Sequence, residues 1–471
     1  MTDGLLGYPE YQDSGVEWLG EIPAHWVTRR IKSLSLVKRG ASPRPISNPR
    51  YFDKNGEYSW VRISDVTAAT TRYLERTTQR LSELGKSYSV PLEPGSLFLS
   101  IAGSVGKPII TKIKCCIHDG FVYFPYLAGN VEFIYYVFTS GNLYSGLGKF
   151  GTQLNLNTDT VGNIVIPFPP PDEQAAIVRF LDEAERRIRR YIRAKQKLIK
   201  LLNEKKQAII QQAVTHGLDP DVPMKDSGVE WLGEIPAHWE VLRSKYVFRE
   251  INNRSITGKE AHLSMSQKHG LILSDMIEER RLVSESYINA KICETGDLVL
   301  NRLKAHLGVF ALAPQQGLVS PDYTVLRPIR AIRDRYFELI LRSPACRLEL
   351  RQRAKGIVEG FWRLYTDDFY EIYLPIPPSE EQHIIVEVLE KELEIVDDSI
   401  DRINHEIDLL REYRTRLIAD VVTGKIDVRG VAFEMPATFD ESDLPDVDGD
   451  DTDDLDELDM DEAFEEGMDA E

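Results

Sequence analysis

An internal repeat constrains the fold of this chain more than any other feature. The 14 residues at positions 13–26, with the sequence DSGVEWLGEIPAHW, recur without change at positions 226–239. Chance does not supply an identical match of this length, and such repeats mark duplicated structural units. The 471 residues are also enough for two or three separate hydrophobic cores. The chain is therefore predicted to fold as two related halves.

A second pair of matching segments follows the two copies. Residues 166–174 read IPFPPPDEQ and residues 374–382 read LPIPPSEEQ. Proline and early acidic residues suit the first turn of a helix, and apolar residues at spacings near 3.5 follow each segment. These signals predict two helices of about 40 residues, a length typical of coiled coils. Two helices of equal length in a duplicated chain are expected to pack against each other, and we predict an antiparallel pair.

The segments between these landmarks are rich in short β-type runs broken by Gly, Asn and Pro. We therefore predict a mixed α/β (α+β) fold with two pseudo-symmetric domains and two long helices. The predicted bounds are 1–165 for the first domain, 166–217 for the first helix, 218–373 for the second domain, 374–428 for the second helix and 429–471 for an acidic tail.

The net charge of −18 is unevenly distributed along the chain. Residues 440–471 contain 18 Asp and Glu and no Lys or Arg, so the rest of the chain is neutral, with 57 charges of each sign. Residues 27–89 carry a net charge of +8 and residues 243–304 a net charge of +3, which suits contact with phosphates. The tail is expected to be disordered, and the alternative is a DNA mimic that competes for the basic surfaces.

Enzyme signatures are absent from the sequence. It contains no P-loop and no HxxxH spacing, and its four cysteines lack the spacing of a metal site. No catalytic residue, metal ligand or bound cofactor is therefore predicted. No apolar run is long enough for a membrane span and no signal peptide is recognisable, so we expect a cytoplasmic protein.

Three features carry a family resemblance: WLGEIPAHW at the start of each half, a strand with a glycine loop at 94–106 and at 295–308, and the proline-rich helix start. Together they resemble the specificity subunit of type I restriction-modification systems, over residues 18–431. The resemblance implies two target-recognition domains, each reading one half of a bipartite asymmetric site in double-stranded DNA. It also implies two methyltransferase subunits and a restriction (translocase) subunit as partners. S-adenosylmethionine, ATP and Mg are implied for those partners alone.

Candidate DNA contacts are polar side chains in loops that differ between the halves, because shared residues cannot read different bases. Trp18, Trp26, Trp231 and Trp239 are identical in both halves, so packing is the preferred interpretation for them. The candidates in the first domain are Arg39, Arg44, Ser104, Lys107, Lys149, Gln153 and Asn155. The candidates in the second domain are Arg302, Lys304, His306, Lys355, Trp362 and Arg363.

Two other functions remain possible from the sequence. One is a fused methyltransferase or nuclease, which would bind S-adenosylmethionine on the isolated chain. The other is a protein scaffold without DNA, which would lack the salt-sensitive binding that phosphate contacts produce.

Overall fold

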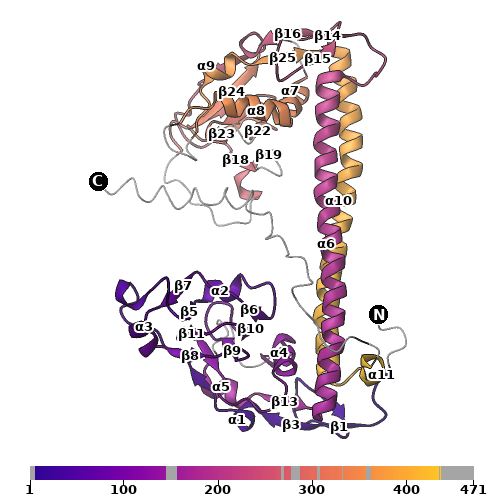
Figure 1. Cartoon of the computed structure of the whole chain (residues 1–471). Coiled ribbons are helices and arrows are strands. Elements are labelled where there is room, and N and C mark those ends of the chain that lie inside the picture. The colour runs from indigo at the N-terminus through magenta and orange to yellow at the C-terminus, as the bar shows by residue number, and fades with distance from the viewer. Residues whose placement is uncertain are drawn as a thin grey trace. The chain divides into compact units, whose positions relative to one another are not determined.

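The computed structural model describes residues 6–144, 156–266, 270–276, 287–304, 308–330, 333–356, 362–433 and 435. The chain divides into two compact units, Met1–Lys195 with His405–Leu455 and Gln196–Asn404 with Asp456–Glu471. Both units combine helices and strands (Figure 1), which confirms the predicted mixed fold with two repeated domains. Of the predicted tail, 429–471, the structure describes residues 429–433 and 435, of which 429–432 form a short helix; the rest of the predicted tail lies outside the described part of the chain.

The first unit begins with the repeated motif. Strand β1 (Tyr11–Asp13) ends at the first residue of the motif. It pairs antiparallel with β2 (Glu21–Pro23), which lies within the motif. The next strand, β3 (Val27–Arg30), pairs antiparallel with β13 (Val165–Phe168). The strand after the motif therefore lies beside the strand that leads into the first long helix.

Two sheets form the body of the first unit. The five-stranded sheet has the order β4 (Lys38–Arg39), β12 (Phe121–Tyr123), β9 (Leu97–Ser100), β10 (Pro108–Thr111) and β6 (Tyr73–Leu74). The four-stranded sheet has the order β7 (Gln79–Leu81), β5 (Tyr58–Val61), β11 (Cys115–Ile117) and β8 (Val90–Leu92). Strands β9, β10 and β11 are buried at every residue, as their continuous apolar runs require.

The first unit also contains short helices. They are α1 (Ile31–Leu34), α2 (Ile63–Thr67), α3 (Glu83–Ser87), α4 (Val131–Thr139), α5 (Thr158–Asn163) and α11 (Arg429–Ala432), with 3-10 turns η1 (Pro49–Tyr51) and η2 (Asn142–Tyr144). Asn130 caps α4 by accepting a hydrogen bond from the backbone of Phe133. The Asn130 backbone in turn donates to the side chain of Gln174 (2.8 Å), which ties α4 to the first turn of the long helix.

The second unit repeats this plan. Its motif strands are β14 (Met224–Asp226) and β15 (Glu234–Pro236), and β16 (Glu240–Arg243) pairs with β25 (Tyr373–Ile376). Its main sheet has the order β17 (Phe248–Ile251), β24 (Tyr323–Pro328), β21 (Leu298–Asn301) and β22 (Phe310–Leu312), which corresponds to β4, β12, β9 and β10. The duplication therefore extends beyond the identical motif to the strand order.

Among the described residues of the second unit there are four further strands and three short helices. Two-stranded ladders join β18 (Leu263–Ser266) to β19 (Gly270–Leu273) and β20 (Lys291–Cys293) to β23 (Gly317–Val319). The helices are α7 (Asp334–Arg342), α8 (Pro344–Arg353) and α9 (Thr366–Tyr370), with 3-10 turns η3 (Ser244–Tyr246) and η4 (Ser274–Met276). None of the helices that the structure describes is long and apolar enough to cross a membrane.

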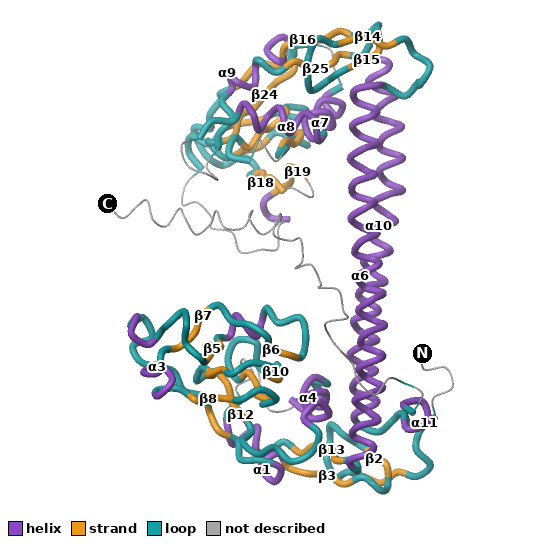
Figure 2. Tube along the Cα trace, viewed as in Figure 1, coloured by secondary structure: helices purple, strands orange, loops and turns teal. Residues whose placement is uncertain are grey.

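The two long helices, α6 (Pro171–His216) and α10 (Ser379–Val422), pack together (Figure 2). In the first unit Glu185 of α6 pairs with Arg414 of α10 (2.7 Å) and Lys195 pairs with Glu406. In the second unit Lys206 pairs with Asp397 (2.5 Å). The residue numbers of the partners on α10 decrease as those on α6 increase, so the helices run antiparallel. This confirms the predicted pair.

The repeated motif holds the start of each long helix. In the second unit the Trp239 indole donates to Glu381 (3.0 Å), and His238 lies 2.7 Å from the same carboxylate. Trp26 makes the corresponding bond to Glu173 (2.9 Å) in the first unit. Because Trp26 and Trp239 are both 1% exposed, the packing interpretation of these tryptophans is confirmed.

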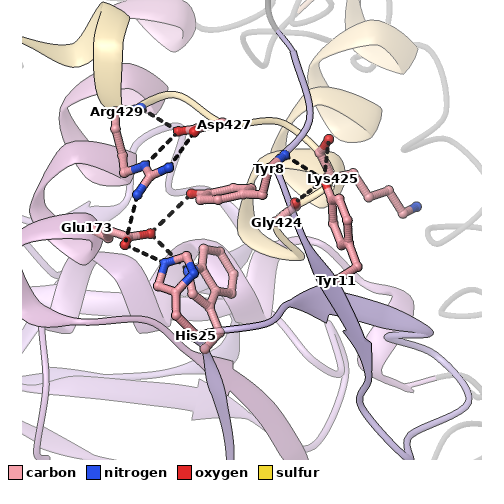
Figure 3. Close-up of polar contacts among 9 residues, drawn as sticks. Tyr8, Tyr11, His25, Glu173, Gly424, Lys425, Asp427 and Arg429 are labelled. Carbon is pink, nitrogen blue, oxygen red and sulfur yellow. Dashed lines mark hydrogen bonds and ion pairs between the residues drawn. The ribbon is translucent and has the colours of Figure 1, made fainter.

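Glu173 has further partners that Glu381 lacks among the described residues (Figure 3). Its carboxylate accepts a hydrogen bond from the Tyr8 hydroxyl (3.2 Å) and lies 3.6 Å from Arg429, in addition to the His25 ring at 2.6 Å, which corresponds to His238 beside Glu381. Tyr8 precedes the first strand and Arg429 follows the second long helix. Glu173 therefore joins three distant parts of the chain, and its side chain is only 6% exposed.

Backbone contacts reinforce this junction. The Asp427 amide donates to the carbonyl of Leu6 (2.9 Å), and the Tyr11 hydroxyl donates to the carbonyl of Gly424 (3.2 Å), as Figure 3 shows for the latter. The segment before β1 thus packs against the segment after α10. These contacts were not predicted from the sequence.

Candidate nucleic-acid interface

Three loops meet at one end of the main sheet in the first unit. Strand β12 runs antiparallel to both β4 and β9, so the ends of β4 and β9 lie beside the start of β12. The Gly40 amide donates to the carbonyl of Phe121 (2.9 Å), and the Ile101 amide donates to that of Gly120 (2.8 Å). We call residues 39–44, 101–107 and 118–120 the first loop edge. It brings together four of the predicted contacts, Arg39, Arg44, Ser104 and Lys107.

Asp119 organises the arginines of the first loop edge. Its side chain accepts hydrogen bonds from the Ser42 hydroxyl (2.8 Å) and from Arg44 Nη2 (2.9 Å). Its backbone carbonyl accepts a bond from Arg39 Nε (2.5 Å). Burial tends to raise the pKa of Asp119, but the Ser42 bond and the nearby His118 and Arg44 outweigh burial, so this pKa lies below its usual value. The carboxylate is therefore charged at neutral pH.

Lys107 and Ser104 are held by neighbouring groups of their own. The Lys107 ammonium donates to the carbonyls of Thr67 (3.1 Å) and Ala69 (2.9 Å) at the end of α2, and burial lowers the pKa of Lys107. The Ser104 hydroxyl bonds to that of Thr67 (2.7 Å). These two residues shape the loop, whereas Arg39 and Arg44 are exposed at the surface.

A hollow of about 600 Å³ lies beside Asp119. It is lined by Ser42, Pro43, Arg44, Pro45, Ile46, His118 and Asp119. A cationic side chain beside an apolar wall can contact the edge of a base and its neighbouring methyl or sugar groups. The Arg44 side chain that lines it is 79% exposed.

The corresponding end of the second sheet carries the second group of predicted contacts. Arg302 follows β21, and its carbonyl accepts a bond from the Leu364 amide (3.1 Å). Lys355 and Arg363 pair through their backbones (2.8 and 2.9 Å). The structure therefore places the 355–364 segment beside Arg302, although more than 50 residues separate them in the sequence. We call residues 302–304, 320–322, 355–356 and 362–364 the second loop edge.

Side-chain contacts at the second loop edge again involve aspartates. Arg302 donates to the Asp322 carbonyl through Nε (2.5 Å) and to its carboxylate through Nη2 (3.1 Å). Lys355 pairs with Asp368 (2.6 Å). The Arg351 guanidinium lies over the Trp362 ring, 5.1 Å from the ring centroid. Lys304 lies in the turn after β21, where its amide donates to the carbonyl of Asn301 (3.2 Å).

Four predicted contacts lie outside the described residues. They are Lys149, Gln153, Asn155 and His306. Asp119 and Asp322 were not predicted from the sequence, because acidic residues are not expected near phosphates. A signal does exist in the sequence, since both aspartates stand just before a strand of apolar and aromatic residues.

Comparison with known proteins agrees with this arrangement. The family model described as the type I restriction modification DNA specificity domain matches residues 23–201 and 247–409. These two matches cover most of the chain, and the chain belongs to this family. It is a type I restriction-modification specificity subunit with DNA-recognition domains, and such subunits are not themselves enzymes.

Individual relatives are distant but extensive. A protein of Methanocaldococcus jannaschii, named as a predicted specificity subunit of the type I restriction enzyme MjaX, is 23% identical over 87% of this chain and 96% of its own length. The MjaIX specificity subunit of the same organism is 23% identical over 58% of this chain and 62% of its own length. One chain from a solved structure of a type I R-M system covers 85% of this chain with a TM-score of 0.60 and 16% identity, and it shares the fold.

Proposed function

We propose that this subunit reads a bipartite, asymmetric DNA site, with one half-site contacted by each loop edge. The observation that carries the proposal is the pairing of a repeated scaffold with different side chains. Both main sheets have the same strand order, yet Arg39 and Arg44 serve one edge and Arg302 and Lys355 the other. Equal scaffolds with unequal contact residues are what two different half-sites require.

Methyltransferase and restriction subunits supply the chemistry in this proposal. They bind S-adenosylmethionine, ATP and Mg, while this chain binds none of these. Among the described residues no group of three or more His, Cys, Asp and Glu could hold a metal ion. The assembled complex acts on DNA in the cytoplasm.

Exposed apolar side chains on the long helices are the surfaces proposed for the two methyltransferase subunits. In the first unit these include Tyr191 of α6 (58% exposed) and Leu409 of α10 (49%). In the second unit they include Leu198, Leu201 and Ile395. Apolar residues exposed on a helix that already has a partner favour a further helix packing against the pair.

Exchange of residues 240–372 for the matching segment of a relative tests the bipartite reading. We expect one half of the methylated sequence to change and the other half to stay the same, because each unit has its own core. Methylation mapping of DNA from cells that carry the exchanged subunit measures this. A change in both halves would contradict separate reading, and DNA binding that does not weaken with salt would favour the protein scaffold.

Deletion of residues 440–471 tests whether the acidic tail takes part in recognition. We expect the recognised sequence and the DNA affinity at low salt to stay the same, because 18 negative charges cannot approach phosphates favourably. Methylation mapping and a binding titration at low and moderate salt measure both quantities. A rise in affinity at low salt would instead identify the tail as a competitor for the basic surfaces.

A further inference from the structure

Both loop edges place an aspartate within two residues of the start of equivalent strands, and Asp119 stands one residue further from its strand than Asp322 does. Asp119 stands two residues before β12, and Asp322 stands immediately before β24, the equivalent strand. Each aspartate binds an arginine through its backbone carbonyl, and the donor is Nε in both cases, at 2.5 Å. Each also binds a guanidinium nitrogen through its carboxylate, at 2.9 Å for Asp119 and 3.1 Å for Asp322.

The arginines reach these aspartates from different places in the fold. Arg39 ends β4 and Arg44 follows it, whereas Arg302 follows β21, and β21 corresponds to β9 rather than to β4. The duplicated scaffold thus keeps the acidic partner while the source of the arginine has changed. If the two units shared this contact only because they are copies of one another, the arginine would come from the equivalent strand in both units.

Surface stability does not account for these pairs. An exposed arginine and aspartate together contribute only about 0–1 kcal/mol, because solvent screens the charges and two long side chains lose freedom. Arg44 is 79% exposed and the Asp322 side chain is 58% exposed. The more informative consequence of these contacts is that they fix the direction of the guanidinium.

The hydrogen-bond geometry leaves one edge of Arg302 available to a ligand. Nε and one hydrogen of Nη2 point to Asp322, so the remaining hydrogens of Nη1 and Nη2 lie along the end of the planar group. Two parallel N–H groups in this arrangement match the N7 and O6 acceptors of guanine in the major groove. A guanidinium that is already held loses less rotational freedom when it binds.

We infer that Asp119 and Asp322 are positioning residues that hold Arg39 with Arg44 and Arg302, respectively, so that each loop edge reads a guanine. The inference rests on the proposed function, since it assumes that the loop edges face DNA. It adds the identity of one base in each half-site, a guanine contacted by the arginines of that loop edge. It also assigns a role to Asp119 and Asp322, whose negative charge by itself would oppose binding to DNA.

The test compares Asp322→Ala with the unchanged chain, each in complex with its methyltransferase subunits. Binding is measured on duplexes in which every position of the mapped site is replaced in turn. We expect the discrimination in favour of one guanine in one half-site to fall on the order of tenfold, because the variant loses the carboxylate bond to Nη2 and keeps only the backbone bond to Nε, so the guanidinium is held less firmly for its bidentate contact. Discrimination in the other half-site stays unchanged, and Asp119→Ala gives the reverse pattern.

Asp275→Ala is the matched control. Asp275 is an exposed aspartate of η4 in the second unit and is not one of the residues that define the second loop edge, so its substitution removes the same charge. A general gain in affinity from the lost charge would appear with both variants, whereas a loss of preference at one guanine is expected only for Asp322→Ala. Asp322→Asn, which keeps one acceptor oxygen, is expected to give a smaller loss.

The outcomes separate this inference from the proposed function. If the unchanged complex shows no sequence-dependent and salt-sensitive binding, the proposed function fails and the inference falls with it. If that binding is normal and Asp322→Ala keeps every base preference, the inference alone is wrong. A uniform loss at all positions, together with a lower unfolding temperature, would assign Asp322 a purely structural role and overturn the inference as well.

Discussion

Asp182→Asn should destabilise the first unit by about 3–5 kcal/mol, the usual cost of removing one partner from a buried ion pair. Asp182 lies in the N-terminal part of α6, and its carboxylate binds Arg72 through two hydrogen bonds, at 2.5 and 3.0 Å. The Tyr136 hydroxyl of α4 donates to the same carboxylate (2.6 Å). The side chains of Arg72 and Asp182 are 5% and 11% exposed.

The contact matters because it joins three elements of the first unit. Arg72 immediately precedes β6 at the edge of the five-stranded sheet, Tyr136 belongs to α4, and Asp182 belongs to the long helix. Burial alone would lower the pKa of Arg72, but the bond to Asp182 and the nearby Tyr136 raise it above its usual value. The guanidinium is charged in the normal chain. Because arginine is not deprotonated in proteins, it also stays charged in the variant, where it has lost its counter-charge.

Glu390→Gln is the internal control for this prediction. Glu390 lies 208 residues after Asp182, at the equivalent position of α10, but its side chain is 54% exposed and its nearest contact with Arg335 is 3.4 Å. We expect its loss to cost less than about 1 kcal/mol. Hydrogen exchange of β6, β10 and α4 in the full chain measures opening of the first unit. Equal effects of the two substitutions would contradict the proposed importance of the buried pair.

The long helices and the duplicated plan could be predicted because their signals are local. Proline and acidic residues at 169–173 and 377–381 indicate the helix starts, and apolar residues near a 3.5-residue spacing indicate the packed face. The identical 14-residue motif indicates two related halves, even though it does not predict the strands within them. The repeat of strand order in the main sheets appeared only in the structure, because most of the sequence between the landmarks has diverged.

The loop edges were predicted in part for a physical reason. Arg39, Arg44 and Arg302 were chosen because cations contact phosphates and bases, and the structure places each at the end of a strand. Their aspartate partners could not be predicted, since 75 residues separate Arg44 from Asp119 and 20 separate Arg302 from Asp322. Pairing at such distances is set by the register of the sheet. Whether the selected side chains contact bases or phosphates stays a prediction.

The junction at Glu173 offers a second large effect with a control provided by the repeat. Glu173→Gln should destabilise the first unit by about 3 kcal/mol, since hydrogen bonds to a charged acceptor contribute about 1.5–3 kcal/mol each. The carboxylate accepts from the Trp26 indole and the Tyr8 hydroxyl and pairs with Arg429. A carboxamide turns an N–H group toward one of these donors and removes the charge that Arg429 faces.

Glu381→Gln should cost about 1 kcal/mol, because Glu381 is 28% exposed and water can replace its partners. His238 and Trp239 bind it as His25 and Trp26 bind Glu173, so the difference between the two variants isolates the contribution of the chain ends. If that contribution is real, Glu173→Gln also loosens the segment before β1, and amide exchange at residues 6–12 rises with it. An equal cost at Glu173 and Glu381, with no added exchange at residues 6–12, would show that the motif alone holds the helix start and that the chain ends contribute nothing to it.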